Sequence, residues 1–335
     1  MRFRTLGRTG IEVSEFAFGC GKVGGIMIDA EPDIMHTAVQ RALASGINWF
    51  DTAAQYGDGR SETNLGRIFD ELGASPYVST KFSVDPADTS DIAGQVESRL
   101  HESLQRLGLE RIELFQLHNM IEATSEGRAL SIEDIIRSGG VIDSLERLRD
   151  QGLFDWIGIT ALGDAGLCRD LIAAGRVDTA QVYYNMLNPT AAHMASGPSQ
   201  AGSGQHFDGL LDACAAANTG VFAIRALAAG VLATDLRHGR ESMITKDTAL
   251  AEEERKTRAV FALFGDRYGT RAQTALRFVL SHPAVSCVDF AVADLAQLDE
   301  GLAAAELNGL PGEAFAQLDE LFRRDYQDGD GRSGE

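Results

Sequence analysis

A repeating order of a short apolar run, a polar or glycine-rich loop and a helical segment extends through most of the 335 residues. This alternation is typical of βα units that build a parallel sheet. Eight units of this kind predict a closed α/β barrel, the (β/α)8 or TIM-barrel fold. The eight predicted strands are Phe16–Gly19, Ile47–Asp51, Tyr77–Lys81, Ile112–Leu117, Trp156–Thr160, Thr179–Val182, Val221–Ile224 and Cys287–Ala291.

Apolar residues recur at three- and four-residue spacing between these runs, which indicates helices. Residues 2–13 form two short alternating runs around a turn, and we expect them to make a β-hairpin lid at one barrel end. The pattern predicts one barrel domain over 1–324 and a polar, disordered tail over 325–335. The clearest predicted helices are 33–45, 61–72, 90–107, 141–151, 206–217, 270–281 and 295–305.

Three long segments interrupt the repeat at 119–140, 186–205 and 234–258, each after a predicted strand. Loops that follow barrel strands meet at the C-terminal mouth, where long insertions shape substrate and cofactor sites. Composition alone does not fix their conformation. The charged run at 251–256 is better interpreted as a solvated helix start than as a binding patch.

Composition narrows the possible partners and the compartment. The net charge of −19 disfavours nucleic acid and anionic membrane surfaces, and no apolar run is long enough to span a bilayer. The chain starts without a basic-then-apolar signal segment, and its four widely spaced cysteines lack a C-x-x-C motif. We therefore expect a soluble cytoplasmic protein with reduced thiols that acts on a small molecule; its oligomeric state stays open.

Four ionisable residues end consecutive strands or begin the loops after them: Asp51, Tyr56, Lys81 and His118. A lysine at the end of a buried strand needs a counter-charge, which Asp51 on the neighbouring strand can supply. The lysine would then favour the phenolate of Tyr56, and we expect the pKa of Tyr56 to fall below 10.

In this arrangement Tyr56 is a general acid and base, and His118 orients a carbonyl oxygen while a nicotinamide supplies a hydride. No metal is required. Each residue also has a simpler interpretation, as a structural ion pair, a loop aromatic or a core histidine. The joint placement of all four favours the catalytic interpretation.

The blocks Gly46–Gly66, Val78–Lys81, Leu114–Asn119, Gly158–Thr160, Gln181–Asn185 and Leu227–Leu232 resemble the aldo-keto reductase superfamily. The resemblance spans about residues 2–305. It implies an NAD- or NADP-dependent oxidoreductase that interconverts a carbonyl and an alcohol. It assigns Tyr56 as the acid and base, Asp51 and Lys81 as the pair that tunes it, and His118 as the orienting group.

The resemblance also implies which residues hold the cofactor. Its expected contacts are Gly19, Cys20, Gly21, Asp51, Thr160, Gln181, Ile224, Arg225, Ala226, Leu227, Gly230, Leu232, Ala291, Asp294 and Gln297. The chain departs from the family pattern at several positions in or beside these contacts. Ala161 stands where relatives often carry Asn, Ile224 where they carry a stacking aromatic, and Arg225 is suited to the cofactor's pyrophosphate. Asp294 stands where NADP-dependent relatives place a cation, which favours NAD.

The substrate and the direction of reaction stay open at this level. Gly21 replaces a common aromatic wall and predicts a roomier pocket. Residues 158–163 resemble the galactose-dehydrogenase-like branch, which suggests an NAD-dependent sugar or polyol dehydrogenase as an alternative. A cofactor-binding regulatory subunit with little turnover is a second alternative. A Rossmann site at Gly19–Gly24 is disfavoured, because its helix starts too late and Asp51 is too distant in sequence.

Overall fold

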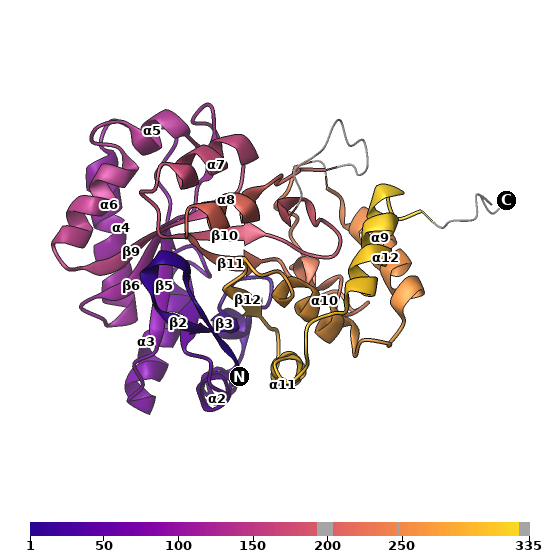
Figure 1. Ribbon diagram of the computed structural model, residues 1–335. Helices are drawn as coiled ribbons and strands as arrows, with labels where there is room; N and C mark the ends of the chain where they lie inside the picture. Colours follow the sequence, from indigo (N-terminus) through magenta and orange to yellow (C-terminus); the bar gives the residue numbers. More distant parts are fainter. Residues whose placement is uncertain (193–203, 247, 328–335) are drawn as a thin grey trace.

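Eight parallel strands form a closed barrel in the computed structural model, which describes residues 1–192, 204–246 and 248–327 (Figure 1). Each strand pairs in parallel with its two neighbours, and β12 closes the barrel against β3. The predicted fold is confirmed, with strand ends shifted by at most two residues. The strands are β3 (Phe16–Gly19), β4 (Trp49–Asp51), β5 (Tyr77–Phe82), β6 (Ile112–Leu117), β9 (Phe154–Ala161), β10 (Thr179–Tyr183), β11 (Gly220–Ile224) and β12 (Cys287–Ala291).

Helices surround the barrel and carry recognisable end signals. Helix α10 begins with a capping box in which the side chains of Thr270 and Gln273 bond each other's backbone N–H groups. Helix α8 is shorter than the predicted 206–217, because Gly209 takes a left-handed φ of 69° just before it. The helices are α1 (Ile26–Asp29), α2 (Pro32–Ala44), α3 (Arg60–Leu72), α4 (Ile92–Leu107), α5 (Ile132–Ile136), α6 (Val141–Asp150), α7 (Ala165–Ala173), α8 (Leu210–Ala216), α9 (Leu250–Phe264), α10 (Arg271–Leu280), α11 (Leu295–Ala304) and α12 (Gly312–Arg323).

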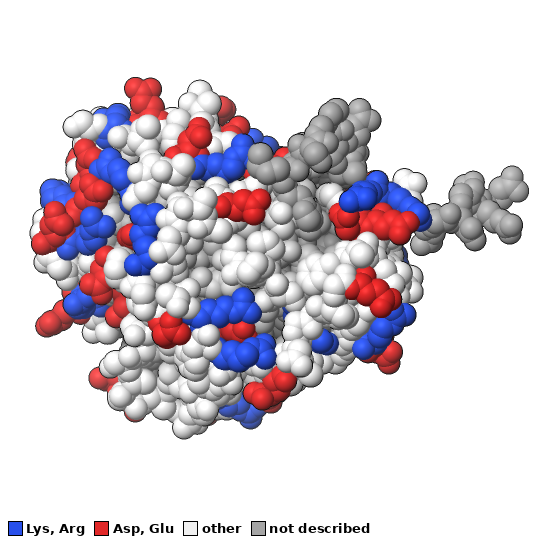
Figure 2. Space-filling view, in the orientation of Figure 1, with Lys and Arg blue, Asp and Glu red and all other residues white. Residues whose placement is uncertain are grey.

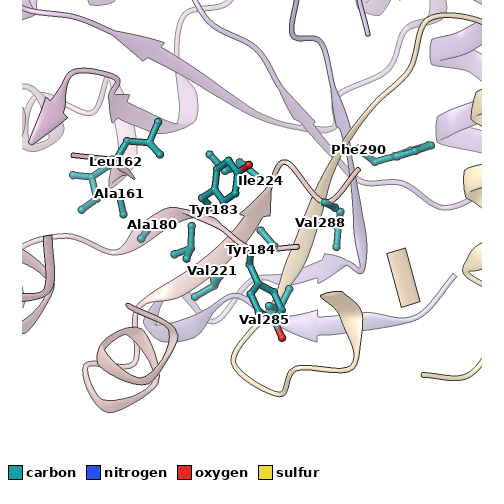
Figure 3. Close-up of a cluster of buried hydrophobic side chains, with 14 of the residues drawn as sticks. Ala161, Leu162, Ala180, Tyr183, Tyr184, Val221, Ile224, Val285, Val288 and Phe290 are labelled. Carbon is teal, nitrogen blue, oxygen red and sulfur yellow. The ribbon is translucent and has the colours of Figure 1, made fainter. Parts of the chain in front are cut away.

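Two apolar cores hold the barrel together. The larger core lies between the strands and the helices, and Figure 3 shows part of it around Val221, Val285 and Val288. The smaller core fills the barrel interior with side chains that include Trp49 and Phe222. Because the strand side chains alternate between these cores, both faces of the sheet are apolar.

The predicted hairpin closes the N-terminal end of the barrel. Strands β1 (Phe3–Thr5) and β2 (Glu12–Ser14) pair antiparallel, and Leu6 and Val13 join the interior core. A Cβ at Gly220, at the start of β11, would lie 2.7 Å from the Leu6 side chain, so Leu6 packs closely against this glycine. Ligands must therefore reach the barrel from the other end, where the strands finish.

The long segments after the strands have structure of their own. The segment 119–140 holds strands β7 (Met120–Glu122) and β8 (Ala129–Ser131), which pair with each other, and helix α5. Within the segment 234–258, residues between 234 and 244 lie at the mouth, and residues 250–258 belong to α9. Residues 193–203 of the segment 186–205 lie outside the described residues.

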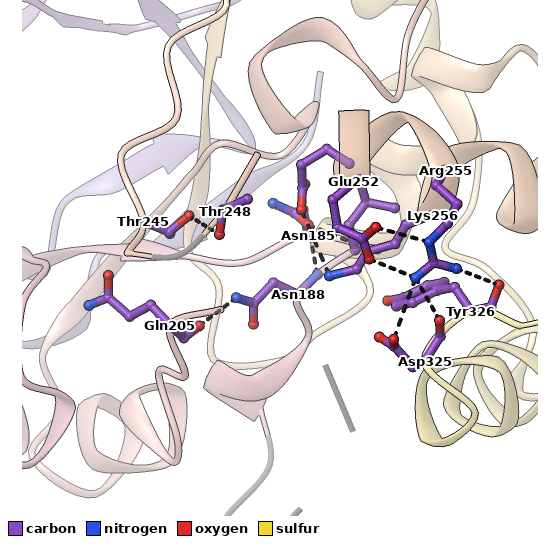
Figure 4. A network of polar contacts seen from close by, with 12 residues as sticks. Asn185, Asn188, Gln205, Thr245, Thr248, Glu252, Arg255, Lys256, Asp325 and Tyr326 are labelled. Carbon is purple, nitrogen blue, oxygen red and sulfur yellow. Dashed lines mark hydrogen bonds and ion pairs between the residues drawn. The ribbon is translucent and has the colours of Figure 1, made fainter. Parts of the chain in front are cut away.

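Two expectations about the C-terminal half are wrong in detail. The charged run at 251–256 belongs to α9, but Glu253 and Lys256 are buried and only 4 Å apart. The predicted tail begins too early, because Tyr326 is buried and donates a hydrogen bond of 2.6 Å to the Met186 carbonyl. Arg255 of α9 also bonds the carbonyls of Asp325 and Tyr326 (Figure 4). Residues 328–335 lie outside the described residues.

Acidic and basic side chains are interspersed over the face shown in Figure 2. Surface ion pairs such as Arg41–Asp299 and Arg147–Glu97 connect neighbouring helices. Within the described residues, every helix is too short or too polar to cross a membrane.

Candidate active site

Lys81 lies at the centre of a buried polar cluster at the C-terminal end of the barrel. Its ammonium forms an ion pair with the Asp51 carboxylate and donates to the Thr52 carbonyl at 2.8 Å. It also lies 3.3 Å from the Tyr56 hydroxyl and 4.9 Å from the centroid of that ring. The sequence therefore placed these three side chains correctly relative to one another.

The strand pairing explains this arrangement. Strands β4 and β5 are neighbours in which Asp51 pairs with Ser79, and Lys81 lies two residues further along the same face. The Ser79 hydroxyl donates to Asp51 at 2.6 Å and accepts from the Trp49 indole at 2.9 Å. The bond from Ser79 satisfies the Asp51 oxygen that Lys81 leaves free.

His118 directly follows β6 and faces Tyr56 across the mouth. Its ring centroid lies 6.0 Å from that of Tyr56, in an edge-to-face arrangement. Its backbone N–H donates to the Phe82 carbonyl at 2.8 Å, which fixes the residue beside β5. Burial, together with the positive charges of Lys81 and Arg128, lowers the pKa of His118 to about 3. The imidazole is therefore neutral near pH 7 and has one N–H to donate.

The pKa of Tyr56 differs from the sequence expectation. Burial raises the pKa to about 12, although the ammonium of Lys81 acts in the opposite direction. The expected fall in the pKa is wrong for this structure. The free-energy cost of removing a phenolate from water is larger than the stabilisation that one nearby cation provides. Tyr56 is consequently a neutral phenol near pH 7.

A cavity of about 630 Å³ opens at the same end of the barrel. Most of the residues expected at the cofactor site or in catalysis line it: Gly21, Tyr56, His118, Thr160, Gln181, Ile224, Arg225, Ala226, Leu227, Gly230, Ala291, Asp294 and Gln297. Five of the expected residues are buried outside this lining. They are Gly19, Cys20, Asp51, Lys81 and Leu232.

The cavity has charged lining residues that the sequence analysis missed, namely Lys22, Arg128, Glu241, Asp289 and Glu300. The sequence did contain a signal for Asp289, because an acidic residue stands within an otherwise apolar strand. Lys81 is unusual in the same way, as a basic residue near the end of a buried strand. No comparable signal marks Lys22 or Arg128, which lie on loops.

The lining fits a nicotinamide group at the end near Tyr56. The Nε2 atom of Gln181 is buried and has no hydrogen-bond partner, so it is available to a carboxamide oxygen. The Thr160 hydroxyl beside it accepts from Gln116 at 2.9 Å. Gly21 leaves room over the Tyr56 ring, since a Cβ there would lie 3.6 Å from it.

The segment after β11 forms another wall of the cavity. Arg225 takes a left-handed φ of 61°, and its guanidinium donates to the Ser242 carbonyl at 2.7 Å. This contact connects the wall to the residues between 234 and 244 that lie at the mouth. Ile224 lies beside Tyr183, with which it pairs between β11 and β10 (Figure 3).

The connection from β12 to α11 lines the far end of the cavity. Asp294 is exposed and accepts a hydrogen bond from the Gln297 backbone N–H at 2.8 Å, so its carboxylate caps α11. The Gln297 side chain accepts from the Ala293 N–H at 2.9 Å. This end of the cavity therefore presents a carboxylate beside a helix N-terminus.

All four cysteines are buried and free of disulfides. Within residues 1–192, 204–246 and 248–327, no cluster of three or more His, Cys, Asp or Glu side chains is arranged to hold a metal ion.

Comparisons with known proteins agree with this geometry. The chain is 31% identical over 165 residues to L-galactose dehydrogenase of Arabidopsis thaliana, covering 48% of this chain and 49% of that protein. It is 27% identical over 340 residues to the uncharacterized oxidoreductase YrpG of Bacillus subtilis, covering 96% of each. The aldo-keto reductase AKR11C1 from Bacillus halodurans, in its holo form, has the same fold, with a TM-score of 0.73, 19% identity and 96% of each chain covered. The model of the Aldo/keto reductase family matches residues 17–323, and the chain therefore belongs to this family.

Proposed function

We propose that this protein is an oxidoreductase that interconverts a carbonyl group and its alcohol, with NAD or NADP as cofactor. The observation that carries the proposal is the contact of Tyr56 with Lys81 at the wall of the cavity, with His118 opposite. A phenol beside a buried ammonium is suited to proton transfer at a substrate oxygen. The bound nicotinamide cofactor would supply or accept the hydride.

In the reductive direction Tyr56 donates its proton to the carbonyl oxygen as that oxygen gains negative charge. The neutral His118 donates a hydrogen bond to the same oxygen and holds it in position. Lys81 stabilises the phenolate that Tyr56 leaves behind, and Asp51 keeps Lys81 in place. The side chains of Gln181 and Thr160 and the wall at Ile224 would hold the nicotinamide.

The protonation state of Tyr56 bears on the direction of reaction. A pKa of about 12 keeps the phenol protonated near pH 7, which is the form that reduction requires. Oxidation of a sugar or polyol is the alternative, and it requires Tyr56 to accept a proton. The positive charge of an oxidised nicotinamide would favour that phenolate. The likeness to L-galactose dehydrogenase makes sugars the first class of alcohol to test.

We further propose that NAD is preferred over NADP. Asp294 presents a carboxylate at the β12 to α11 connection, where it would repel a 2′-phosphate. Arg240, between residues 234 and 244 at the mouth, forms an ion pair with Asp29 at 3.2 Å, so much of its charge is already balanced.

A steady-state assay tests the proposed function. Turnover is measured with NADH and NADPH on a panel of aldehydes, ketones and sugars, and with NAD and NADP on sugars and polyols. We expect turnover with at least one class. Tight cofactor binding without turnover on the whole panel would instead support a regulatory subunit. The presence of all four residues of the proposed catalytic set, Asp51, Tyr56, Lys81 and His118, argues against that alternative.

A further inference from the structure

Asp289 is a second carboxyl group that lies beside the catalytic cluster. It lies on the inner face of β12 and lines the cavity. Its carboxyl group lies over Gly19 of β3, the residue that pairs with Asp51 of β4, and its Oδ1 atom is buried and has no partner. The mechanism proposed above assigns Asp289 no role.

Gly19 on the neighbouring strand β3 makes room for this carboxyl group. A Cβ at position 19 would lie 2.3 Å from the Asp289 Oδ1 atom, which is closer than the two can approach. The barrel therefore accommodates an acid at this position only because a glycine faces it.

The charges around Asp289 favour its protonated form. Besides Asp51, the titratable groups near it are Lys81 on β5, Tyr56 after β4, Arg225 after β11, Cys20 after β3, and Cys287 on its own strand. Lys81 and the Ser79 hydroxyl both donate to Asp51, which marks Asp51 as the carboxylate.

No lysine or arginine in the described part of the chain forms an ion pair with Asp289, and Arg225 donates to Ser242 instead. Burial and then the charge of Asp51 raise the pKa of Asp289 well above its ordinary value. Two neighbouring buried carboxyl groups with one ammonium nearby are expected to share a single negative charge.

We propose that Asp289 is a positioning residue for hydride transfer, a neutral carboxylic acid that donates its proton to Asp51 and so fixes the carboxylate that holds Lys81 beside Tyr56. Only the kinetic consequence of this inference depends on the proposed function. The shared proton itself is a property of the unliganded protein.

Two substitutions at position 289 separate positioning from packing. Asp289→Leu keeps a side chain of similar size but removes the donor, and we expect kcat to fall about tenfold or more, as for loss of a hydrogen bond to a charged group. Asp289→Asn retains an N–H donor toward Asp51 and should restore kcat to within about threefold of the wild type. Cofactor affinity should stay within about twofold in both variants, because the effect passes through Lys81 and Tyr56.

Asp178→Asn is the matched control, because Asp178 is also buried but precedes β10 at the opposite end of the barrel. It accepts a hydrogen bond from the Ile157 N–H and should not change kcat. Equal losses in Asp289→Leu and Asp289→Asn, or no loss in either, would overturn the positioning role.

Infrared spectroscopy tests the shared proton without turnover. The unliganded wild type at pH 7 should show the C=O stretch of a protonated buried carboxylic acid. This band should be absent from Asp289→Asn, the variant expected to fold most readily, and from Asp289→Leu. A spectrum without such a difference would reject the proposal even if the protein is an active oxidoreductase.

The pH dependence of unfolding gives a second test of the same proton. Because the folded pKa of Asp289 is raised, the unfolded chain loses this proton above about pH 4 while the folded protein keeps it. The unfolding equilibrium constant of the wild type should therefore rise relative to Asp289→Asn, by about tenfold per pH unit, until the folded group also ionises. Parallel curves for the two proteins would contradict the proposal, whatever the turnover assay shows.

Discussion

The ammonium of Lys81 lies 3.3 Å from the hydroxyl oxygen of Tyr56, with its charge balanced by Asp51. This contact does not lower the pKa of Tyr56 below its ordinary value in the unliganded protein, because burial has the larger effect. The lysine instead reduces the free-energy cost of forming the Tyr56 phenolate. Its benefit would appear when the proton leaves for the substrate, that is, in the transition state of the chemical step.

Tyr56→Phe removes the proton donor and leaves the ring in place. We expect kcat to fall about 100- to 10,000-fold, the range for loss of a general acid, and cofactor affinity to change by less than about twofold. Steady-state kinetics and fluorescence titration measure the two effects. Tyr77→Phe, at the start of β5, is the control and should behave like the wild type. Activity retained in Tyr56→Phe would rule out the mechanism.

Lys81→Met leaves the Asp51 carboxylate buried without its cation. We expect a loss of about 3 to 5 kcal/mol in the free energy of unfolding, together with loss of turnover. Urea unfolding measures the first effect. The double variant Asp51→Asn/Lys81→Met should recover much of the stability but none of the activity, because it removes both charges. If the double variant were as unstable as the single one, the ion pair would not be the cause.

Asp294→Arg replaces the carboxylate at the far end of the cavity with a cation. We expect the ratio of NADPH to NADH affinity to rise about tenfold or more, since a charged contact replaces a repulsion. Fluorescence titration with both cofactors gives the ratio. Asp299→Arg, on the same helix α11 but paired with Arg41, should leave it unchanged. Wild-type protein that binds NADPH far more tightly than NADH would contradict the NAD proposal.

His118 should make the protein less stable in acid. Its pKa is about 3 in the folded state and about 6.5 when unfolded, so between these values the unfolded chain binds the additional proton. The free energy of unfolding should therefore fall as the pH drops from about 6.5 toward 3, by up to about 1.4 kcal/mol per pH unit. Urea unfolding of the wild type and His118→Gln across this range isolates the effect, since the other histidines are common to both. Curves with the same slope would show that His118 is not the group responsible.

Local sequence determined the barrel and the core of its site. Alternating apolar runs and helical patterns carry the information for βα units, and the parallel order of β4, β5 and β6 brings their C-terminal ends to one mouth. Lys81 at the end of a buried strand was therefore enough to predict its pairing with Asp51. The prediction succeeded because both residues follow from strand pairing between neighbours in sequence and in space.

Only the tertiary structure decided the energetics of the site. The raised pKa of Tyr56 depends on how completely the surrounding walls exclude water, which no local pattern records. Asp289 on the last barrel strand comes close enough to Asp51 on the second for each charge to act on the other, because the barrel closes through β12 and β3. The burial of Tyr326 likewise depends on distant partners such as Met186. Sequence patterns therefore specified which groups reach the mouth of the barrel, while barrel closure and burial determined the protonation states of those groups.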